Sequence, residues 1–256
     1  MLIALTHTVS PSLAEGEVTF IDREPVDYDL ALQQHAAYCN ALEQCGVEVK
    51  RLSVNPDSPD SCFIEDTAIV VDEAIIATNI GSPTRQHESK NVALELARYR
   101  EIIRIQPPAT IDGGDVLRVG RRIYVRVSGR TNDQGFHELA QILQPWNYEV
   151  IPVELKNCLH LKTACTAIDD ETILLNPHWV APEVFSDYKV LSVPEEEGWA
   201  ANTIRVGGTV LLQRGFPQTL QIVEKYHDSI ATLDISEFRK VEAGLSCLSI
   251  IFQGAA

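Results

Sequence analysis

One arrangement of secondary structure recurs along this chain: a strand, a tight turn, a second strand, a helix and a third strand. Apolar alternation and turn residues predict it four times, at intervals of roughly 45 to 50 residues. The first unit begins at 62–80, where Asp72 and Glu73 separate two β-rich runs, and continues through a helix over 84–98. Three further units begin near IDGGDVLRV, HLKTACTAID and NTIRVGG. Because no such unit can bury its apolar face alone, the units are expected to pack against one another.

The two ends of the chain supply a fifth unit. GLSCLSIIF and MLIALTH are strands left over from the other four units, and a helix over 27–45 and the strand VEVKRLSV follow them. The helix is predicted from Leu32, Ala36, Cys39 and Leu42, and it ends at Gly46, which suits a left-handed C-cap. We therefore expect an α/β fold, a ring of five ββαβ units closed by the N- and C-terminal strands. Residues 1–256 contain no linker-like segment and are expected to form a single domain.

The charge of the chain narrows its possible partners. The 256 residues include 21 Lys and Arg against 36 Asp and Glu, a formal net charge of −15 at pH 7. This excess of negative charge opposes binding to nucleic-acid phosphates and to anionic membranes. We therefore expect a small cationic ligand, and neither nucleic acid nor a membrane as a partner.

The six cysteines, at positions 39, 45, 62, 158, 165 and 247, form no CxxC or Cys/His zinc spacing. A chain of this length can bury a sizeable core without disulfides, so reduced thiols are predicted. The opening MLIALTHTVS has neither a basic segment nor a small-residue cleavage site, and no window offers about 18 consecutive apolar residues. These features predict a cytoplasmic protein.

Three segments place a reactive or ionisable residue where a strand pattern predicts an apolar one. Cys247 lies in GLSCLSIIF, His160 in LHLKT and Asp112 in IDGGD, each at the beginning of a different unit. Taken singly, the cysteine is typical of core packing, the histidine of a structural role and the Asp-Gly pair of a turn. Together they are the parts of an activated-cysteine site. Equivalent positions in a ring converge on its axis, which would allow the three residues to meet.

A fourth segment, FIEDT, lies at the same point of another unit and contributes Glu65 and Asp66. Carboxylates there would pair with a cation. A guanidinium matches them best, because its planar fork donates two parallel hydrogen bonds.

Seven segments become recognisable when they are taken together. They are PDSCFIEDTAIV (59–70), GSPTRQHE (81–88), TIDGGDVL (110–117), SGRTNDQG (128–135), LHLKTAC (159–165), EEEGWAANTI (195–204) and EFRKVEAGLSCLSIIF (237–252). In this order and at these separations they resemble the dimethylarginine dimethylaminohydrolase family of the guanidino-group-modifying (pentein) superfamily, over essentially the whole chain. The resemblance implies a five-bladed α/β propeller with pseudo-five-fold symmetry. It also implies hydrolysis of N-ω-methylated arginine to citrulline and a methylamine, with no metal or organic cofactor.

The resemblance also assigns roles to single residues. Cys247 corresponds to the family's nucleophile, His160 to its proton-transfer residue and Asp112 to the acidic residue that supports the histidine. The positions that hold the amino-acid substrate correspond to Asp60, Glu65, Asp66, Arg85, Arg130, Val241 and Glu17. Glu17 stands where the family usually has a leucine on a flexible lid, and the alternative is a side chain that points to solvent. The alternative for the two arginines is an ordinary surface ion pair.

The residue two positions after the histidine separates branches of the superfamily. Deiminases that act on unsubstituted guanidines resemble this chain but have Asp there, whereas this chain has Lys162. Loss of that carboxylate removes a partner for a free amino group, which favours methylated arginines over arginine. A related deiminase or amidinotransferase, or a non-catalytic propeller, is the alternative. The expected partner is a small cationic amino-acid substrate, bound by a monomer or homodimer.

Overall fold

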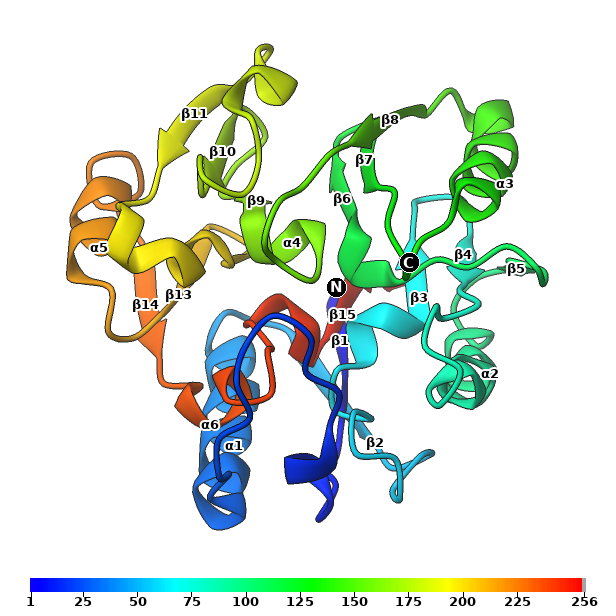
Figure 1. The fold of residues 1–256 in the computed structure, drawn as a ribbon, viewed down its shortest axis with the longest axis horizontal. Helices are drawn as coiled ribbons and strands as arrows, with labels where there is room; N and C mark the ends of the chain where they lie inside the picture. The colour runs from blue at the N-terminus through cyan, green and yellow to red at the C-terminus, as the bar shows by residue number, and fades with distance from the viewer. Residues whose placement is uncertain (255–256) are drawn as a thin grey trace.

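A computed structural model describes residues 1–254 of the chain, which form five three-stranded sheets arranged in a ring (Figure 1). In each sheet the middle strand pairs antiparallel with one neighbour and parallel with the other. Helices α1, α2, α3 and α5 lie toward the outside of the ring, and strands β3, β6, β9 and β15 lie toward its centre (Figure 1). The predicted ring of five units is confirmed.

The units follow one another around the ring. The first comprises β3 (Ala68–Val70), β4 (Ile75–Ala77), α2 (Gln86–Leu96) and β5 (Ile102–Arg104). The second comprises β6 (Val116–Val119), β7 (Arg122–Arg126), α3 (Asp133–Leu143) and β8 (Glu149–Val153). The third comprises β9 (Cys165–Ala167), β10 (Thr172–Leu175) and β11 (Lys189–Ser192), and the fourth comprises β12 (Ile204–Val206), β13 (Thr209–Gln213), α5 (Pro217–Val223) and β14 (Ile230–Leu233). The third unit departs from the predicted pattern, because only the 3-10 turn η5 (Pro182–Phe185) stands between its second and third strands.

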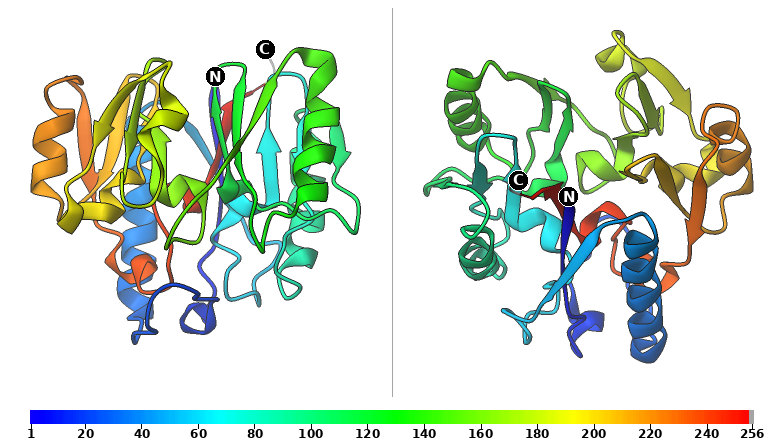
Figure 2. Two further views of the ribbon diagram at one scale, coloured as in Figure 1. Left: turned by 45° about the horizontal axis from the view of Figure 1, so that its top comes forward. Right: turned by 180° about the vertical axis from the view of Figure 1, so that it is seen from behind.

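The fifth unit joins the two ends of the chain, as predicted. It contains β15 (Ile250–Gln253), β1 (Leu2–His7), α1 (Tyr28–Gln44) and β2 (Glu48–Leu52). Strand β15 pairs antiparallel with β1, and β1 pairs parallel with β2. The Gly254 amide donates to the Met1 carbonyl over 2.9 Å, so the ring is closed by main-chain hydrogen bonds. Figure 2 shows the same closure from two further sides.

Helix α1 begins and ends where the sequence predicts. The Asp27 side chain accepts a hydrogen bond from the Leu30 amide at its start, and Gly46 follows its end with a φ of 80°. The predicted apolar face was wrong in two positions, because Leu32 and Ala36 are exposed. The buried face instead includes polar Gln34, which donates to Ser236 of helix α6 (Ser236–Arg239). A search for apolar spacing alone therefore misses this face.

The hydrophobic core is divided among the junctions between units. Ile76 of the first unit packs in one cluster with Ile123 and Leu139 of the second, and the other four clusters likewise combine residues of two neighbouring units. Each unit therefore needs both neighbours to bury its apolar surface. Within residues 1–254, every helix is too short or too polar to cross a membrane.

Candidate active site

A short helical turn precedes the first strand of each unit and lies near the ring's centre. These turns are η2 (Ile64–Thr67), η3 (Gly113–Asp115), α4 (Leu161–Ala164), η6 (Glu195–Ala201) and η7 (Ser246–Leu248). The sequence predicted strand at several of these positions, and Cys247 inside a strand, which was wrong. Cys247 lies on η7, and strand β15 begins only at Ile250. Each turn has only three to seven residues and ends at or just before a strand, which is too short for a helical periodicity to show in the sequence.

Two glycines allow the turns to approach one another closely. A Cβ on Gly113 would lie 2.0 Å from the main-chain oxygen of Glu65. A Cβ on Gly114 would lie 2.8 Å from Nδ1 of His160 and 2.9 Å from a carboxylate oxygen of Asp66. The DGGD segment, which the sequence alone interprets as a turn, thus provides the space in which the histidine and the aspartate meet.

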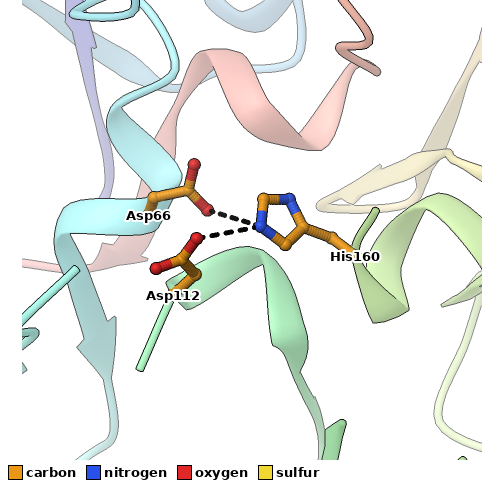
Figure 3. Close-up of side chains that lie close together, drawn as sticks. All are labelled: Asp66, Asp112 and His160. Carbon is orange, nitrogen blue, oxygen red and sulfur yellow. Dashed lines mark hydrogen bonds and ion pairs between the residues drawn. The ribbon is translucent and has the colours of Figure 1, made fainter. Parts of the chain in front are cut away.

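Figure 3 shows two carboxylates from different units, Asp66 and Asp112, directed at the same ring nitrogen of His160. Its Nε2 lies 3.1 Å from an oxygen of Asp112 and 4.0 Å from an oxygen of Asp66. The other oxygen of Asp112 accepts the Gly81 amide over 2.7 Å, which fixes the carboxylate. Burial alone would lower the pKa of His160, but Asp66, Asp112 and Asp115 together raise it to about 9. The imidazole is therefore protonated at neutral pH.

Asp66 is ionised in the same network. Burial would raise its pKa, but the charges of His160 and Arg85 lower it to about 2. One oxygen accepts the Gly114 amide over 2.9 Å and the other accepts Nη1 of Arg85 over 2.8 Å. Asp66, Asp112 and His160 are close enough to hold a metal ion, but the hydrogen bonds within the protein already explain their arrangement.

Cys247 lies in a small cavity of about 20 Å³ that is also lined by His160, Asp66 and Val241. Such a volume holds about one water molecule. Burial, with the nearby charges of Glu65 and Asp66, raises the pKa of the thiol to about 12. The sulfur also accepts the Gly244 amide over 3.4 Å. Cys247 and His160 thus line one cavity and Asp112 contacts His160, with the thiol neutral before any ligand is bound.

The other predicted residues lie around this cavity, with one exception. Asp60, Arg85, Arg130 and Glu17 all line it. Glu65 does not: its carboxylate lies 2.5 Å from Nζ of Lys162 and accepts the Ser246 hydroxyl over 2.9 Å, beside a separate cavity of about 370 Å³. We predicted that Glu65 holds the substrate directly. In the structure, Lys162 and Ser246 already bond to both of its carboxylate oxygens.

Both predicted arginines bond to carboxylates at the cavity, Arg85 buried and Arg130 partly buried. Arg85 is buried, and its guanidinium bonds to Asp66, to Glu88 and to the Phe63 carbonyl. Arg130 is bonded through Nη2 to Glu17 over 2.6 Å. Glu17 consequently does not point to solvent, which was the alternative for it.

Sequence reasoning missed residues that position the site. The buried Asn202 side chain donates to the Lys162 carbonyl over 2.7 Å and to the Ser246 hydroxyl over 2.9 Å, and it accepts the Ser246 amide. It thereby ties the cysteine turn to the histidine turn. Asp115 accepts the Leu161 amide over 3.3 Å, next to His160. Both residues stand at or beside the start of a unit, and that equivalence of position was the signal that could have identified them.

The chain was compared with known proteins. The family model described as "N,N dimethylarginine dimethylhydrolase, eukaryotic" matches residues 21–183. N(G),N(G)-dimethylarginine dimethylaminohydrolase of Streptomyces coelicolor is 37% identical over 96% of this chain and 95% of its own length. The corresponding protein of Pseudomonas aeruginosa is 32% identical over 97% of this chain and 98% of its own length.

Solved structures agree with these sequence matches. The Pseudomonas aeruginosa protein, as a cysteine-to-serine mutant complexed with citrulline, superimposes with a TM-score of 0.93 at 32% identity, over 98% of both chains. The N-terminal domain of an arginine dihydrolase from cyanobacteria shares the fold, with a TM-score of 0.83 at 16% identity over 98% of both chains. Because the family model matches more than half of the chain and both named relatives match nearly all of it, the chain belongs to the dimethylarginine dimethylaminohydrolase family.

Proposed function

We propose that this protein hydrolyses N-ω-methylated L-arginine to L-citrulline and dimethylamine or methylamine. The observation that carries the proposal is the cavity in which Cys247, His160 and Asp66 meet from three different units. The family relationship supports the same reaction. Solved relatives hold citrulline and, as an adduct, S-methyl-L-thiocitrulline, which supports a small amino-acid substrate for this chain.

The first half-reaction replaces an amine by the thiol. Asp66 holds the guanidinium, and the bound cation lowers the pKa of Cys247 by direct attraction, so that the thiol loses its proton to solvent and the thiolate forms when substrate is present. The sulfur attacks the guanidinium carbon. His160, protonated in the free protein, gives its proton to the departing nitrogen, and the carbon–nitrogen bond breaks. The products of this step are a neutral dialkylamine and an S-alkylthiouronium on Cys247.

The second half-reaction restores the protein. A water attacks the thiouronium carbon while His160 takes one of its protons, and the carbon–sulfur bond breaks to release citrulline. One imidazole thus serves both steps, and Asp112 keeps it oriented for both over a 3.1 Å contact. No metal or organic cofactor is needed for this sequence of bonds.

The amino-acid end of the substrate would lie at the other side of the cavity. Arg130 would bind the α-carboxylate, and Asp60 the α-ammonium. Arg85 stabilises the charge of Asp66 and also adds positive charge near the substrate α-carboxylate. Val241 would contribute an apolar contact to the substrate. Lys162 neutralises Glu65, so no second free carboxylate is left for an unsubstituted amino group, which favours methylated substrates.

The test is product analysis with purified protein. Asymmetric dimethylarginine and monomethylarginine should each yield citrulline and the matching amine, and arginine should yield much less citrulline. Cys247→Ser should abolish turnover and leave the fold intact, because a hydroxyl is close to isosteric with the thiol but stays protonated without a strong base. Ammonia as the main product would instead indicate a deiminase, and a transferred amidino group would indicate an amidinotransferase. A tenth of wild-type activity in Cys247→Ser would remove that residue from the mechanism.

We further propose that the protein acts in the cytoplasm as a monomer or homodimer. All six cysteines are unpaired, which suits a reducing compartment. Analytical ultracentrifugation would distinguish the two assembly states.

A further inference from the structure

The carboxylate of Glu17 is bonded to Arg130, the residue that the substrate carboxylate would need. One of its oxygens accepts Nη2 of Arg130 over 2.6 Å, and the other accepts the hydroxyls of Ser82 and Thr84. Burial would raise the pKa of Glu17, but these hydroxyls and the Arg130 guanidinium lower it. The side chain is thus an ionised carboxylate with three donors, which is the environment expected of a bound substrate carboxylate.

The main chain around Glu17 is also held by hydrogen bonds. The Glu17 amide donates to both oxygens of Asp60 over 3.2 Å. The amides of Thr19 and Phe20 donate to the carboxylate of Glu242 over 2.6 and 3.1 Å. Glu242 itself has a φ of 62°, uncommon for a residue with a side chain, which points to a position set by its contacts. Segment 17–20 is therefore held across the site at several points.

The pair formed by Glu17 and Arg130 stands between two cavities. Inside lies the space of about 20 Å³ next to Cys247, and outside lies a groove of about 500 Å³. Glu17, Arg130 and Leu159 line both of them. A methylated arginine does not fit into the inner space while the pair is closed, so segment 17–20 must move for substrate to enter.

What happens after entry depends on the substrate's own charges. A substrate with an α-carboxylate competes with Glu17 for Arg130, because two carboxylates at one guanidinium repel each other. A substrate without that carboxylate leaves the pair free to form again. Its ammonium would then face the acidic groups of Asp60, Glu17 and Glu242. The acidic surroundings therefore favour a purely cationic head group over a zwitterionic one.

We propose that Glu17 determines head-group specificity by acting as a built-in competitor for the α-carboxylate site at Arg130. The inference rests on the proposed function, and it names a second substrate class for the same site: N-methylated guanidinoalkylamines, which lack an α-carboxylate. The contacts of Glu17 with Arg130, Ser82 and Thr84 carry it, since they place a protein carboxylate on the donors that a substrate carboxylate would use.

The experiment compares dimethylarginine with its decarboxylated counterpart, a dimethylguanidino-butylamine. Glu17→Leu removes the competing carboxylate, and Glu17→Gln keeps its shape without its charge. The ratio of kcat/KM for dimethylarginine to that for the amine should rise by about fivefold to thirtyfold in Glu17→Leu, the range for a partly exposed charged contact. Glu17→Gln should give a smaller rise. Glu15→Gln, at an exposed acidic residue of the same loop, should leave the ratio unchanged.

A binding measurement makes the result independent of turnover. Calorimetry on Cys247→Ser, with and without Glu17→Leu, gives the affinities of the same two ligands. Tighter binding of dimethylarginine and weaker binding of the amine in Glu17→Leu supports the inference. Equal changes for both ligands, or no measurable binding of either, would overturn it. If wild type forms no citrulline while the affinity ratio still shifts, the proposed reaction is wrong and the role of Glu17 stands.

Discussion

His160 and Cys247 both carry their protons in the free site. The pKa of His160 is about 9 and that of Cys247 about 12, so at neutral pH the free site holds an imidazolium and a neutral thiol. Asp66 is the ionised group that can receive a guanidinium. A cation must therefore arrive before the thiolate is favoured, and in the proposed reaction the substrate is that cation.

The charge on His160 predicts how stability depends on pH. Its pKa in the folded protein is about 9, above the ordinary value of 6.5. The imidazolium therefore stabilises the fold fully below pH 6.5, and this stabilisation is lost as pH rises through 9, a change of about 3 kcal/mol. Urea unfolding of wild type and His160→Gln on both sides of this window measures the effect, and wild type should lose its extra stability in alkali.

A matched control is available at another histidine. His137→Gln changes an exposed histidine and should leave the wild-type pH dependence in place. If the free energies of unfolding of wild type and His160→Gln run parallel across the window, the assignment of a stabilising charge to His160 is wrong.

At the scale of secondary-structure elements, the short turns at the centre position the candidate catalytic residues. Asp66 lies on η2, Cys247 on η7, and His160 and Asp112 immediately precede α4 and η3. The strands and outer helices support these turns and contribute no side chain to the contacts of His160 with its carboxylates. Glycines decide how closely the turns pack.

Gly114→Ala is expected to damage the site more than the fold. The new methyl group would meet the His160 ring and the Asp66 carboxylate at under 3 Å, which must push one of them away. Because displacement of a catalytic group by about 1 Å can cost a hundredfold in rate, activity should fall by about that factor. The free energy of unfolding should fall by about 1 to 3 kcal/mol, as for overpacking in a core.

Gly208→Ala provides the comparison for this substitution. Gly208 lies in the turn between β12 and β13, with nothing within 4 Å of the added carbon. The free energy of unfolding of Gly208→Ala should therefore differ from that of wild type by less than about 0.5 kcal/mol. Steady-state kinetics and urea unfolding of both variants measure the changes in rate and in the free energy of unfolding. Wild-type activity in Gly114→Ala would show that the close approach of the turns is not required.

At the scale of the whole molecule, the location of the core argues against independent units. All five hydrophobic clusters of the described residues span a junction between neighbours, and β15 with β1 closes the last junction. Opening any junction exposes apolar surface on two units at once. We therefore propose that the chain is a single domain that unfolds as one.

Cooperative unfolding can be followed with probes in different units. Trp146 belongs to the second unit, whereas Trp179 and Trp199 contact each other with ring centroids 5.9 Å apart beside the third. Tryptophan fluorescence and far-ultraviolet circular dichroism should give coincident urea transitions. Leu143→Ala, in the core between the first two units, should shift both curves equally by about 2 to 5 kcal/mol. Separate transitions would show that the units unfold independently.

Local patterns along the chain were enough to predict the ring. The repeat, the bounds of α1, the left-handed Gly46 and the pairing of the terminal strands depend on neighbouring residues or on strand periodicity, and the structure confirms them. Short motifs also identified Cys247, His160 and Asp112 together. Local patterns failed where helical turns were too short to show a periodicity of their own, and where polar residues such as Gln34 lay on a buried face.

The choice of partner for each charged group was decided only by the tertiary structure. Glu65 bonds to Ser246, 181 positions away, and Glu17 to Arg130, 113 positions away. Such pairs depend on how whole units pack, because a shift of an ångström between two turns decides which donor a carboxylate reaches. The sequence by itself therefore determined the ring and the candidate residues of its site. Packing of the units determined which carboxylates stay free for a substrate and which, like Glu65 and Glu17, are already bonded to the protein.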